Sequence, residues 1–328
     1  MRCSMVAFCL LLALLGAVAH ADVTISHDNN VVALPPPPGN AIFNQPDIGD
    51  LFANGAFVRT APGTNLGNLL LADSQSLLGL LPGDDINAVH IELRPLANGD
   101  EFGIFPAFTF SVDVGAAGGT GTAVAAQAPF NAADLFESNG SGFNAWTLDE
   151  LQMGLAATAA TDIDANLLTQ LSSLTGNPWV YFSLAPGSPT LSALGASAAD
   201  ILATRALGTP KVSITATQLG LRNADDLDAL VMLSGADAND DGDFNDPGDS
   251  FPMVIFSVSP SSQGRTGTAV NGQFINDFPP GGDIFFSSLG GVNTLFRDDA
   301  VLGLANDDNL DSLDLPEMSV PGVPPLTG

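Results

Sequence analysis

The stretch from Asp237 to Asp249, DANDDGDFNDPGD, is the part of this sequence best suited to bind a metal ion. It contains six aspartates, two asparagines and two glycines in thirteen residues. Charges at this density repel one another unless the loop is fully solvated or encloses a cation. Oxygens at alternate positions of a short loop can converge on one hard cation, and a glycine permits the sharp turn between them. The stretch therefore predicts a calcium site, with a polar loop of Asx turns as the alternative.

The spacing of these residues resembles that of known calcium loops. The pattern D-x-[DN]-x-[DN]-G begins at Asp237 and is similar to the loops of EF-hand, dockerin and thrombospondin type 3 proteins. The ligands that the resemblance implies are Asp237, Asn239, Asp241, Asn245, Asp249 and the backbone carbonyl of Asp243. The usual last position holds Gly248, so Asp249 stands one residue late. The flanking segments LVMLSG and FPMVIFSV have strand character, so a pair of EF-hand helices is not predicted.

The chain contains internal repeats that must position this loop. The segments FTFSVDVGAAGGTGTAV and VIFSVSPSSQGRTGTAV share FSV and TGTAV at equal spacing, and VYFSLAPGSPTL is a third copy. Their Phe-Ser pairs begin at Phe110, Phe182 and Phe256, which are 72 and 74 residues apart. Repetition at this regular spacing predicts one structural unit per copy, with the three phenylalanines in the core.

Two further elements accompany the Phe-Ser strands. The first reads GDLF, ADLF, ADIL and GDIF, beginning at Gly49, Ala133, Ala199 and Gly282. The second is a glycine between apolar residues, followed by an acidic turn and a short apolar segment. The acids of these turns include Asp84, Asp85, Asp225, Asp226, Asp228, Asp307, Asp308 and Asp311. Their recurrence before an apolar strand favours turn capping, and further cation sites are the alternative.

The repeats predict a mainly β fold. Short β-branched and aromatic segments alternate with Gly, Pro, Asn and Asp, and a single unit of this kind cannot bury its apolar face alone. We expect a repeat domain of about four units over residues 41–315, with a small β-propeller favoured over a sandwich array or a solenoid. Related segments near both ends of the chain could complete one unit together.

Helix is the minority expectation. Thr147 to Glu150 resembles a capping box, and Ile163, Leu167, Leu168 and Leu171 fit one helical face. These two signals predict one or two short helices in the second unit. The stretch LSALGASAADILATRALG is compatible with helix or strand.

The ends of the chain indicate secretion. Residues 1–21 contain one arginine, an apolar run from Met5 to Val18 and the small-x-small site Ala19-His20-Ala21, as in a secretory signal peptide. Cleavage before Asp22 would remove both cysteines, Cys3 and Cys9. Residues 22–40 contain a Pro-rich spacer and residues 316–328 form a Pro-rich tail without an apolar anchor. We therefore expect a secreted, extracellular or periplasmic protein without a disulfide.

The composition excludes some partners. The chain carries 36 acidic residues, of which five are Glu and 31 are Asp, against 8 basic residues, for a net charge of −28. Nucleic acids and anionic membranes bind basic surfaces, so neither is an expected partner. The excess of Asp over Glu favours turns and calcium ligation, with a salt-adapted surface as the alternative.

Signals for catalysis are sparse. After residue 21 the chain has two histidines, His27 and His90, one lysine, Lys211, and no cysteine. Neither a G-x-S-x-G elbow nor a P-loop occurs in the sequence. A glycosidase needs only two suitably separated carboxylates, which this sequence could supply. No catalytic residue is therefore predicted, and enzyme activity remains the alternative.

The repeat pattern also bears on function. The whole chain resembles uncharacterised secreted bacterial proteins built from FSV, DIF, LGL and DDxDAL units. That resemblance implies secretion and repetition but supplies no activity. The sequence favours a calcium-stabilised, noncatalytic repeat protein for extracellular binding, adhesion or matrix structure, with a glycan or a protein as its ligand. The alternatives are a secreted polysaccharide hydrolase and a dockerin-like module, which the presence of one loop instead of two disfavours.

Overall fold

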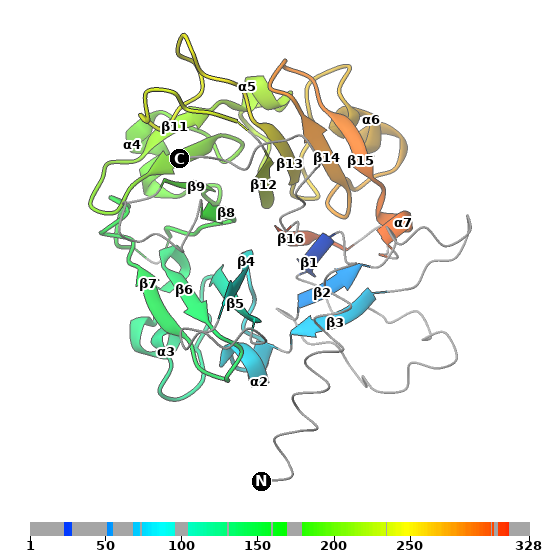
Figure 1. Cartoon of the computed structure of the whole chain (residues 1–328). Coiled ribbons are helices and arrows are strands. Elements are labelled where there is room, and N and C mark those ends of the chain that lie inside the picture. The colour runs from blue at the N-terminus through cyan, green and yellow to red at the C-terminus, as the bar shows by residue number, and fades with distance from the viewer. Residues whose placement is uncertain are drawn as a thin grey trace.

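The residues that the structure describes form sixteen strands in four antiparallel sheets of four strands each (Figure 1). The computed structural model describes residues 23–27, 51–54, 68–72, 74–95, 104–129, 131–158, 160–168, 179–233, 235–302, 304 and 308–314. The expectations for residues 1–21, for the spacer and for the tail lie outside these ranges. The mainly β class that the sequence predicts is confirmed.

Within each sheet, neighbouring strands follow one another along the chain. The exception is β16, the last strand, which pairs with β1 in the first sheet. The first sheet has the order β16 (Leu310–Asp314), β1 (Val23–His27), β2 (Leu51–Asn54) and β3 (Asn68–Ala72). The second has β4 (Ala88–Pro95), β5 (Ile104–Ser111), β6 (Leu135–Ser138) and β7 (Ala145–Leu148). The third has β8 (Ala165–Leu168), β9 (Val180–Ser183), β10 (Ile201–Thr204) and β11 (Lys211–Ile214). The fourth has β12 (Ala229–Leu233), β13 (Met253–Ser257), β14 (Ile284–Ser287) and β15 (Thr294–Arg297).

The four sheets lie around a shared centre (Figure 1). The strands nearest this centre, β4, β8, β12 and β16, contact one another in sequence, and β16 in turn contacts β4. Strand β1 pairs antiparallel with β16, with Ile25 opposite Leu313. Strands from opposite ends of the chain therefore share one sheet, as the related terminal segments suggested.

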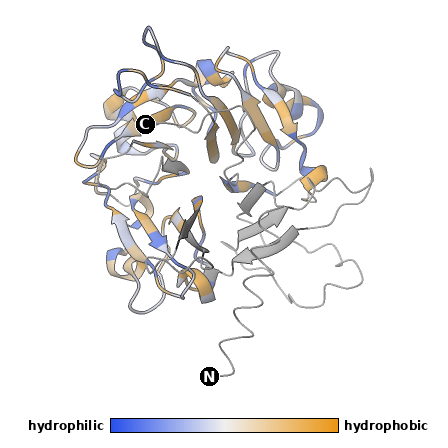
Figure 2. Ribbon diagram, viewed as in Figure 1, coloured by the Kyte–Doolittle hydropathy of each residue, from blue (hydrophilic) through white to orange (hydrophobic). Residues whose placement is uncertain are grey.

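The hydrophobic core lies largely between neighbouring sheets. One cluster joins the second and third sheets through Leu135 and Phe182, and another joins the third and fourth through Tyr181 and Phe256. A further cluster joins the fourth sheet to β16. Apolar residues (orange in Figure 2) occur in many of the coloured strands and short helices. The second, third and fourth sheets thus bury apolar residues against neighbouring sheets.

The repeated Phe-Ser pairs occupy the second strand of three sheets. Phe110, Phe182 and Phe256 are all 0% exposed, which confirms them as core residues. The serine after each phenylalanine forms a hydrogen bond to the next sheet. Its hydroxyl donates to a backbone carbonyl at or just before the start of that sheet's innermost strand, the one nearest the shared centre. These bonds are Ser111 to Ile163 at 3.2 Å, Ser183 to Leu227 at 2.7 Å and Ser257 to Leu310 at 2.7 Å.

The helix prediction for the second unit was wrong in both places. Residues 145–148 form β7, and Ala165–Leu168 form β8, which pairs antiparallel with β9. Leu171 lies outside the described residues. The apolar spacing that suggested a helix is overridden by pairing with the buried β9, since tertiary context outweighs local propensity.

More short helices occur than the one or two that we expected. They are α2 (Ser74–Leu78), α3 (Ala123–Gln127), α4 (Pro189–Leu194), α5 (Ala216–Leu219), α6 (Ala269–Asn276), α7 (Asp299–Leu302) and the 3-10 helix η2 (Asn131–Ala133). The ambiguous segment LSALGASAADILATRALG contains both classes, because α4 ends at a left-handed Gly195 before β10 begins.

Candidate cation sites

The predicted calcium loop, residues 237–249, connects β12 to β13 and is called here the acidic loop. An isolated antiparallel bridge between Ala236 and Ser250 closes its base. The loop therefore spans two adjacent antiparallel strands, as the flanking strand patterns predicted.

Backbone N–H groups hold the first half of the acidic loop. The Asp237 carboxylate accepts hydrogen bonds from the N–H of Asp241 at 3.1 Å and of Gly242 at 2.5 Å. Asp241 accepts from the N–H of Asp243, and Asp243 from the N–H of Asn245, both at 3.0 Å. Asp241 and Asp243 each make an Asx-type turn, since they accept the N–H two residues later, whereas Asp237 reaches the N–H groups four and five residues later.

Gly242 is the turn residue that the sequence pattern requires. Its φ is +89°, in the region that favours glycine, and a Cβ there would lie 2.5 Å from the Trp179 ring. The Trp179 indole N–H in turn donates to Asp240 at 3.1 Å. Trp179 therefore attaches the acidic loop to the third sheet, whose strand β9 begins at the next residue.

The other predicted ligands have partners of their own. The side-chain amide of Asn239 donates to Asp246 at 2.7 Å, and the side-chain Oδ1 of Asn245 accepts from Gln218 at 2.9 Å. Asp249 accepts from the backbone N–H of Ala238 and of Asp246, both at 2.9 Å. Asp249 therefore closes the second half of the loop.

Three carboxylates of the acidic loop converge. Asp241, Asp243 and Asp246 offer oxygens that lie within 4.8 Å of one another, a spacing that could hold a metal ion. Asp241 belongs to the predicted set through its carboxylate and Asp243 only through its backbone carbonyl, whereas Asp246 was not chosen. It is one of the six aspartates of the stretch, but its position has no ligand role in the calcium-loop pattern.

Basic side chains from the third sheet neutralise part of this charge. Lys211 Nζ lies 3.1 Å from Asp241 and 3.2 Å from Asp243, and Arg205 pairs with Asp240. The pKa of Asp241 is lowered, first by the N–H of Asp243 and then by Lys211. The pKa of Asp240 is lowered mainly by Arg205. The charges of Asp240, Asp241 and Asp243 are thus partly paired.

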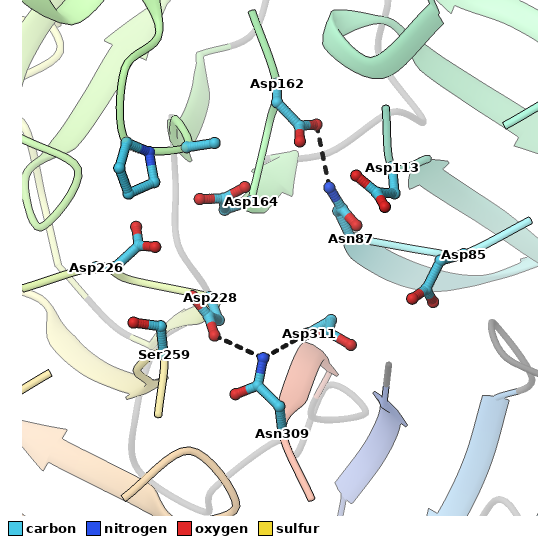
Figure 3. A pocket seen from close by; sticks show the side chains of 12 residues that line it. Asp85, Asn87, Asp113, Asp162, Asp164, Asp226, Asp228, Ser259, Asn309 and Asp311 are labelled. Atoms are coloured by element: carbon cyan, nitrogen blue, oxygen red, sulfur yellow. Dashed lines mark hydrogen bonds between the residues drawn. The ribbon is translucent and has the colours of Figure 1, made fainter. Parts of the chain in front are cut away.

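A second acidic group lies at the shared centre of the four sheets (Figure 3). It lines an open cavity of about 250 Å³, called here the axial cavity. The lining residues are Asp85, Asn87, Asp113, Asp162, Asp164, Ala185, Pro186, Asp226, Asp228, Ser259, Asn309 and Asp311. Seven of these twelve residues are aspartates and none is basic.

The repeated acidic turns supply eight of these residues, two from each repeat. The four copies of the turn align as Asp84-Asp85-Ile86-Asn87, Thr161-Asp162-Ile163-Asp164, Asp225-Asp226-Leu227-Asp228 and Asp308-Asn309-Leu310-Asp311. The second and fourth positions line the axial cavity, while the apolar third position is 0% exposed in every copy. This alternation is the two-residue period of an extended chain entering a strand.

The first position of the turn has a different role. Asp84 accepts hydrogen bonds from the N–H of Leu81, Ala117 and Gly118, at 2.7 to 2.9 Å. Asp225 accepts from the N–H of Arg222, Gln263 and Gly264, at 2.7 to 3.1 Å. These carboxylates are turn caps, as the sequence favoured. Asp307, the remaining candidate of this group, lies outside the described residues.

Burial and mutual repulsion act on the axial carboxylates. Burial, with the charge of Asp113 in second place, raises the pKa of Asp162 to about 7. Burial likewise raises the pKa of Asp226 to about 7 and that of Asp164 well above its usual value. Asparagine amides offset part of this charge. Asn87 donates to Asp162 at 3.0 Å, and Asn309 donates to Asp228 at 2.9 Å and to Asp311 at 2.7 Å (Figure 3).

One axial group could hold a metal ion. Oxygens of Asp164, Asp226 and Asp228 lie within 4.8 Å of one another. Asp226 and Asp228 were candidates in the sequence, but Asp162, Asp164 and Asp113 were not chosen. The aligned segments TDIDAN and DDLDAL carried the signal for Asp162 and Asp164. Nothing in the sequence indicated that four copies of this turn meet at one cavity.

Acidic residues also cap the outer strands of the sheets. Asp134, Asp200 and Asp283, from the repeated D-L-F-type element, each accept the N–H of the residue sixteen positions later. Burial first, and then the hydrogen bond with Glu150, raise the pKa of Asp134 to about 8. Two further groups of carboxylates among the described residues could hold a metal ion. One consists of Asp134, Asp149 and Glu150, and the other of Asp277, Asp298 and Asp299.

Neither a search for membrane-spanning helices nor comparison with known proteins narrows the range of possible functions. Among the residues that the structure describes, no helix has the length and apolar character needed to cross a bilayer. Comparison with protein-family models, curated proteins and solved structures found no match to this chain. The fold and the acidic groups thus define a mainly β protein with several groups of carboxylates that could hold metal ions.

Proposed function

We propose that the protein is a secreted, calcium-stabilised, noncatalytic repeat protein for extracellular binding, adhesion or matrix structure. Its four sheets are the blades of a small β-propeller. The acidic loop carries its calcium ion. The observation that carries this proposal is the convergence of Asp241, Asp243 and Asp246 within a loop of the calcium-binding pattern.

Three features support the propeller. The central strands β4, β8, β12 and β16 contact one another in a closed series. Hydrophobic clusters lie between successive sheets, as they must when blades pack face to face. Finally, β1 pairs with β16, so strands from both ends of the chain complete one blade.

Secretion rests on the sequence. Cleavage before Asp22 leaves β1 intact, since this strand begins at Val23. The mature chain would have no cysteine, so a bound cation would take over part of the stabilisation that disulfides give many secreted domains. Extracellular calcium modules commonly bind with dissociation constants of about 0.1 to 1 mM, which matches the calcium concentration outside cells.

Calcium in the acidic loop would bind the converging carboxylates of Asp241, Asp243 and Asp246. The other predicted ligands, Asp237, Asn239, Asn245, Asp249 and the carbonyl of Asp243, would complete its coordination. Lys211 occupies the space between Asp241 and Asp243, and a bound cation would displace its ammonium group. Calcium thus replaces an internal counter-ion and joins the two ends of the β12–β13 connection.

The test is calorimetric titration and thermal melting of the wild type and of the double variant Asp237→Ala, Asp241→Ala. At calcium tenfold above its dissociation constant, binding should stabilise the wild type by about 1.4 kcal/mol and raise Tm by a few degrees. The double variant should lose the contribution of the acidic loop to both effects. Asp240→Ala is the matched control, since Asp240 pairs with Arg205 and is not a predicted ligand. A wild type without calcium uptake would refute the proposal.

A polysaccharide hydrolase is the second candidate, and the axial cavity favours it. Hydrolysis needs a protonated acid beside an ionised carboxylate, and raised pKa values such as that of Asp164 provide the first. Screening the purified protein against glycans, for both retention and cleavage, separates the two functions. Retention without cleavage supports a binding protein, whereas cleavage that Asp164→Asn abolishes supports the hydrolase.

A further inference from the structure

We propose that the axial cavity binds a second calcium ion through Asp164, Asp226 and Asp228. Asp164 directly precedes β8 of the third sheet, whereas Asp226 and Asp228 precede β12 of the fourth. The ion therefore connects two sheets at the shared centre. This site is independent of the calcium site in the acidic loop.

The spacing of the oxygens fits calcium. Calcium–oxygen bonds are about 2.3 to 2.6 Å long, so ligands on opposite sides of the ion lie about 4.6 to 5.2 Å apart. Oxygens of the three aspartates all lie within 4.8 Å of one another. One ion can therefore contact all three without rearrangement of the backbone. The volume of the axial cavity, about 250 Å³, leaves room for water molecules to complete the coordination.

Buried polar atoms without partners provide a second, independent indication of a ligand. Asn309 lines the axial cavity and is only 6% exposed, yet its Oδ1 has no hydrogen-bond partner. Asp226 Oδ1 is also buried without a hydrogen-bond partner, and Figure 3 shows the Asp226 side chain directed toward Asp164. Native proteins satisfy nearly all buried polar atoms, so the unpartnered Asp226 oxygen beside Asp164 indicates a bound cation that both carboxylates would ligate.

The charge balance of the cavity selects a cation. None of the twelve lining residues is basic, whereas Lys211 and Arg205 pair with the acidic loop. The Asn309 amide bridges Asp228 and Asp311, and its partial positive charge is the nearest substitute for a counter-ion.

The backbone holds the three ligands in place before any ion binds. Ser183 donates to the carbonyl of Leu227, the residue between Asp226 and Asp228, and Ser111 donates to the carbonyl of Ile163, next to Asp164. Asp225 fixes the turn before Asp226 through three backbone N–H groups. Such a preorganised site binds its ion with little loss of conformational freedom.

The test counts calcium ions bound to the full mature chain by equilibrium dialysis. The wild type should bind two ions at saturating calcium. The loop variant Asp237→Ala, Asp241→Ala should keep one, and so should the axial variant Asp164→Asn, Asp226→Asn. Combining the four substitutions should abolish binding. Asp200→Asn is the matched control, since it alters a carboxylate that caps the N–H of Ala216 and does not line the axial cavity, so it should keep both ions.

Thermal melting in a chelator separates binding from folding. The axial variant should melt above the wild type, because neutral amides remove repulsion that no metal offsets. An axial variant that melts lower or fails to fold would show that the carboxylates serve the structure without an ion, and would overturn the proposal. So would a loop variant that binds no calcium while the wild type binds one. If the axial variant alone loses an ion, the axial site stands and the loop assignment fails.

Discussion

The acidic loop and the axial cavity both contain several aspartates, but the negative charge of these aspartates is offset differently in the two regions. In the acidic loop the carboxylates accept hydrogen bonds from neighbouring backbone N–H groups and pair with Lys211 and Arg205 at the surface. In the axial cavity seven aspartates from different repeats face one another without a basic neighbour among the lining residues.

This difference teaches where a cation contributes most. A partly solvated loop can remain folded without metal, since water and lysine offset its charge. Buried carboxylates that face one another must take up protons or bind a cation. We therefore expect calcium to affect local order in the acidic loop, and the contacts between sheets at the axial cavity.

The largest effect should come from the core that supports the axial carboxylates. Phe182 on β9 is 0% exposed and pairs with Asn166 of β8, the strand that follows Asp164. Phe182→Ala should cost about 3 to 5 kcal/mol of unfolding free energy in urea denaturation, because it leaves a buried cavity. Phe143→Ala, at a residue 63% exposed, should cost less than about 0.5 kcal/mol. Calcium affinity of the acidic loop should persist in folded Phe182→Ala, and its loss would contradict the independence of the two regions.

A smaller effect should distinguish the two neighbouring aspartates of one repeat. Asp84 caps three backbone N–H groups, whereas Asp85 lines the axial cavity. Asp84→Ala leaves these buried donors without their acceptor and should cost on the order of 2 kcal/mol, with or without calcium. Asp85→Ala should cost much less in a chelator, because it removes one of the facing charges. Equal losses in urea denaturation would show that both residues are structural caps.

The sequence predicted the acidic loop better than the axial cavity, for a physical reason. The ligands of the loop are consecutive along the chain, so their spacing is visible directly. The axial residues are adjacent only after four sheets assemble. Asp225 and Asp226 are chemically identical neighbours, and only the direction of the extended chain separates the cap from the cavity residue.

Contacts that form only when the strands assemble also explain why the helix prediction failed and why one other prediction succeeded. The spacing of Ile163, Leu167 and Leu168 suits a helix, and the pairing of β8 with β9, which local sequence does not encode, decided for a strand. The burial of Phe110, Phe182 and Phe256 was predictable because repeated apolar residues occupy equivalent core positions whatever the arrangement of the units. Secretion, the signal peptide and the calcium ion stay predictions.

The pH dependence of stability should show whether burial raises the pKa of an acidic residue outside both regions. Asp134 lies outside both regions, and burial, followed by its hydrogen bond with Glu150, raises its pKa to about 8 in the folded state, against about 3.9 in the unfolded chain. The folded state therefore binds more protons, so this contribution is full below about pH 4 and is lost as the pH rises through about 8. Asp134→Asn, which stays neutral, should flatten the decline in stability between pH 5 and 8.

The measurement is urea denaturation at several pH values in a chelator. Asp200→Asn is the matched control, because Asp200 accepts the equivalent backbone N–H, from Ala216. The control should keep the pH dependence of the wild type. An Asp134→Asn variant with an unchanged slope would show that this carboxyl stays ionised, and that burial does not by itself perturb the acids of this protein.

The smallest effect should come from the counter-ion of the acidic loop. Lys211 contacts Asp241 and Asp243, so its ammonium group competes with calcium for the same oxygens. Lys211→Met should therefore strengthen calcium binding several-fold in a calorimetric titration, while changing stability in a chelator by no more than about 1 kcal/mol, as for other exposed ion pairs. Arg205→Gln removes the same charge but frees Asp240, which is not a predicted ligand, so its calcium affinity should change less. If both substitutions strengthen binding equally, the loop attracts calcium only through its net charge and the specific ligand set is wrong. If Lys211→Met weakens binding, the lysine orders the loop instead of competing for it, and the contrast between a paired surface loop and an unpaired axial cavity no longer holds.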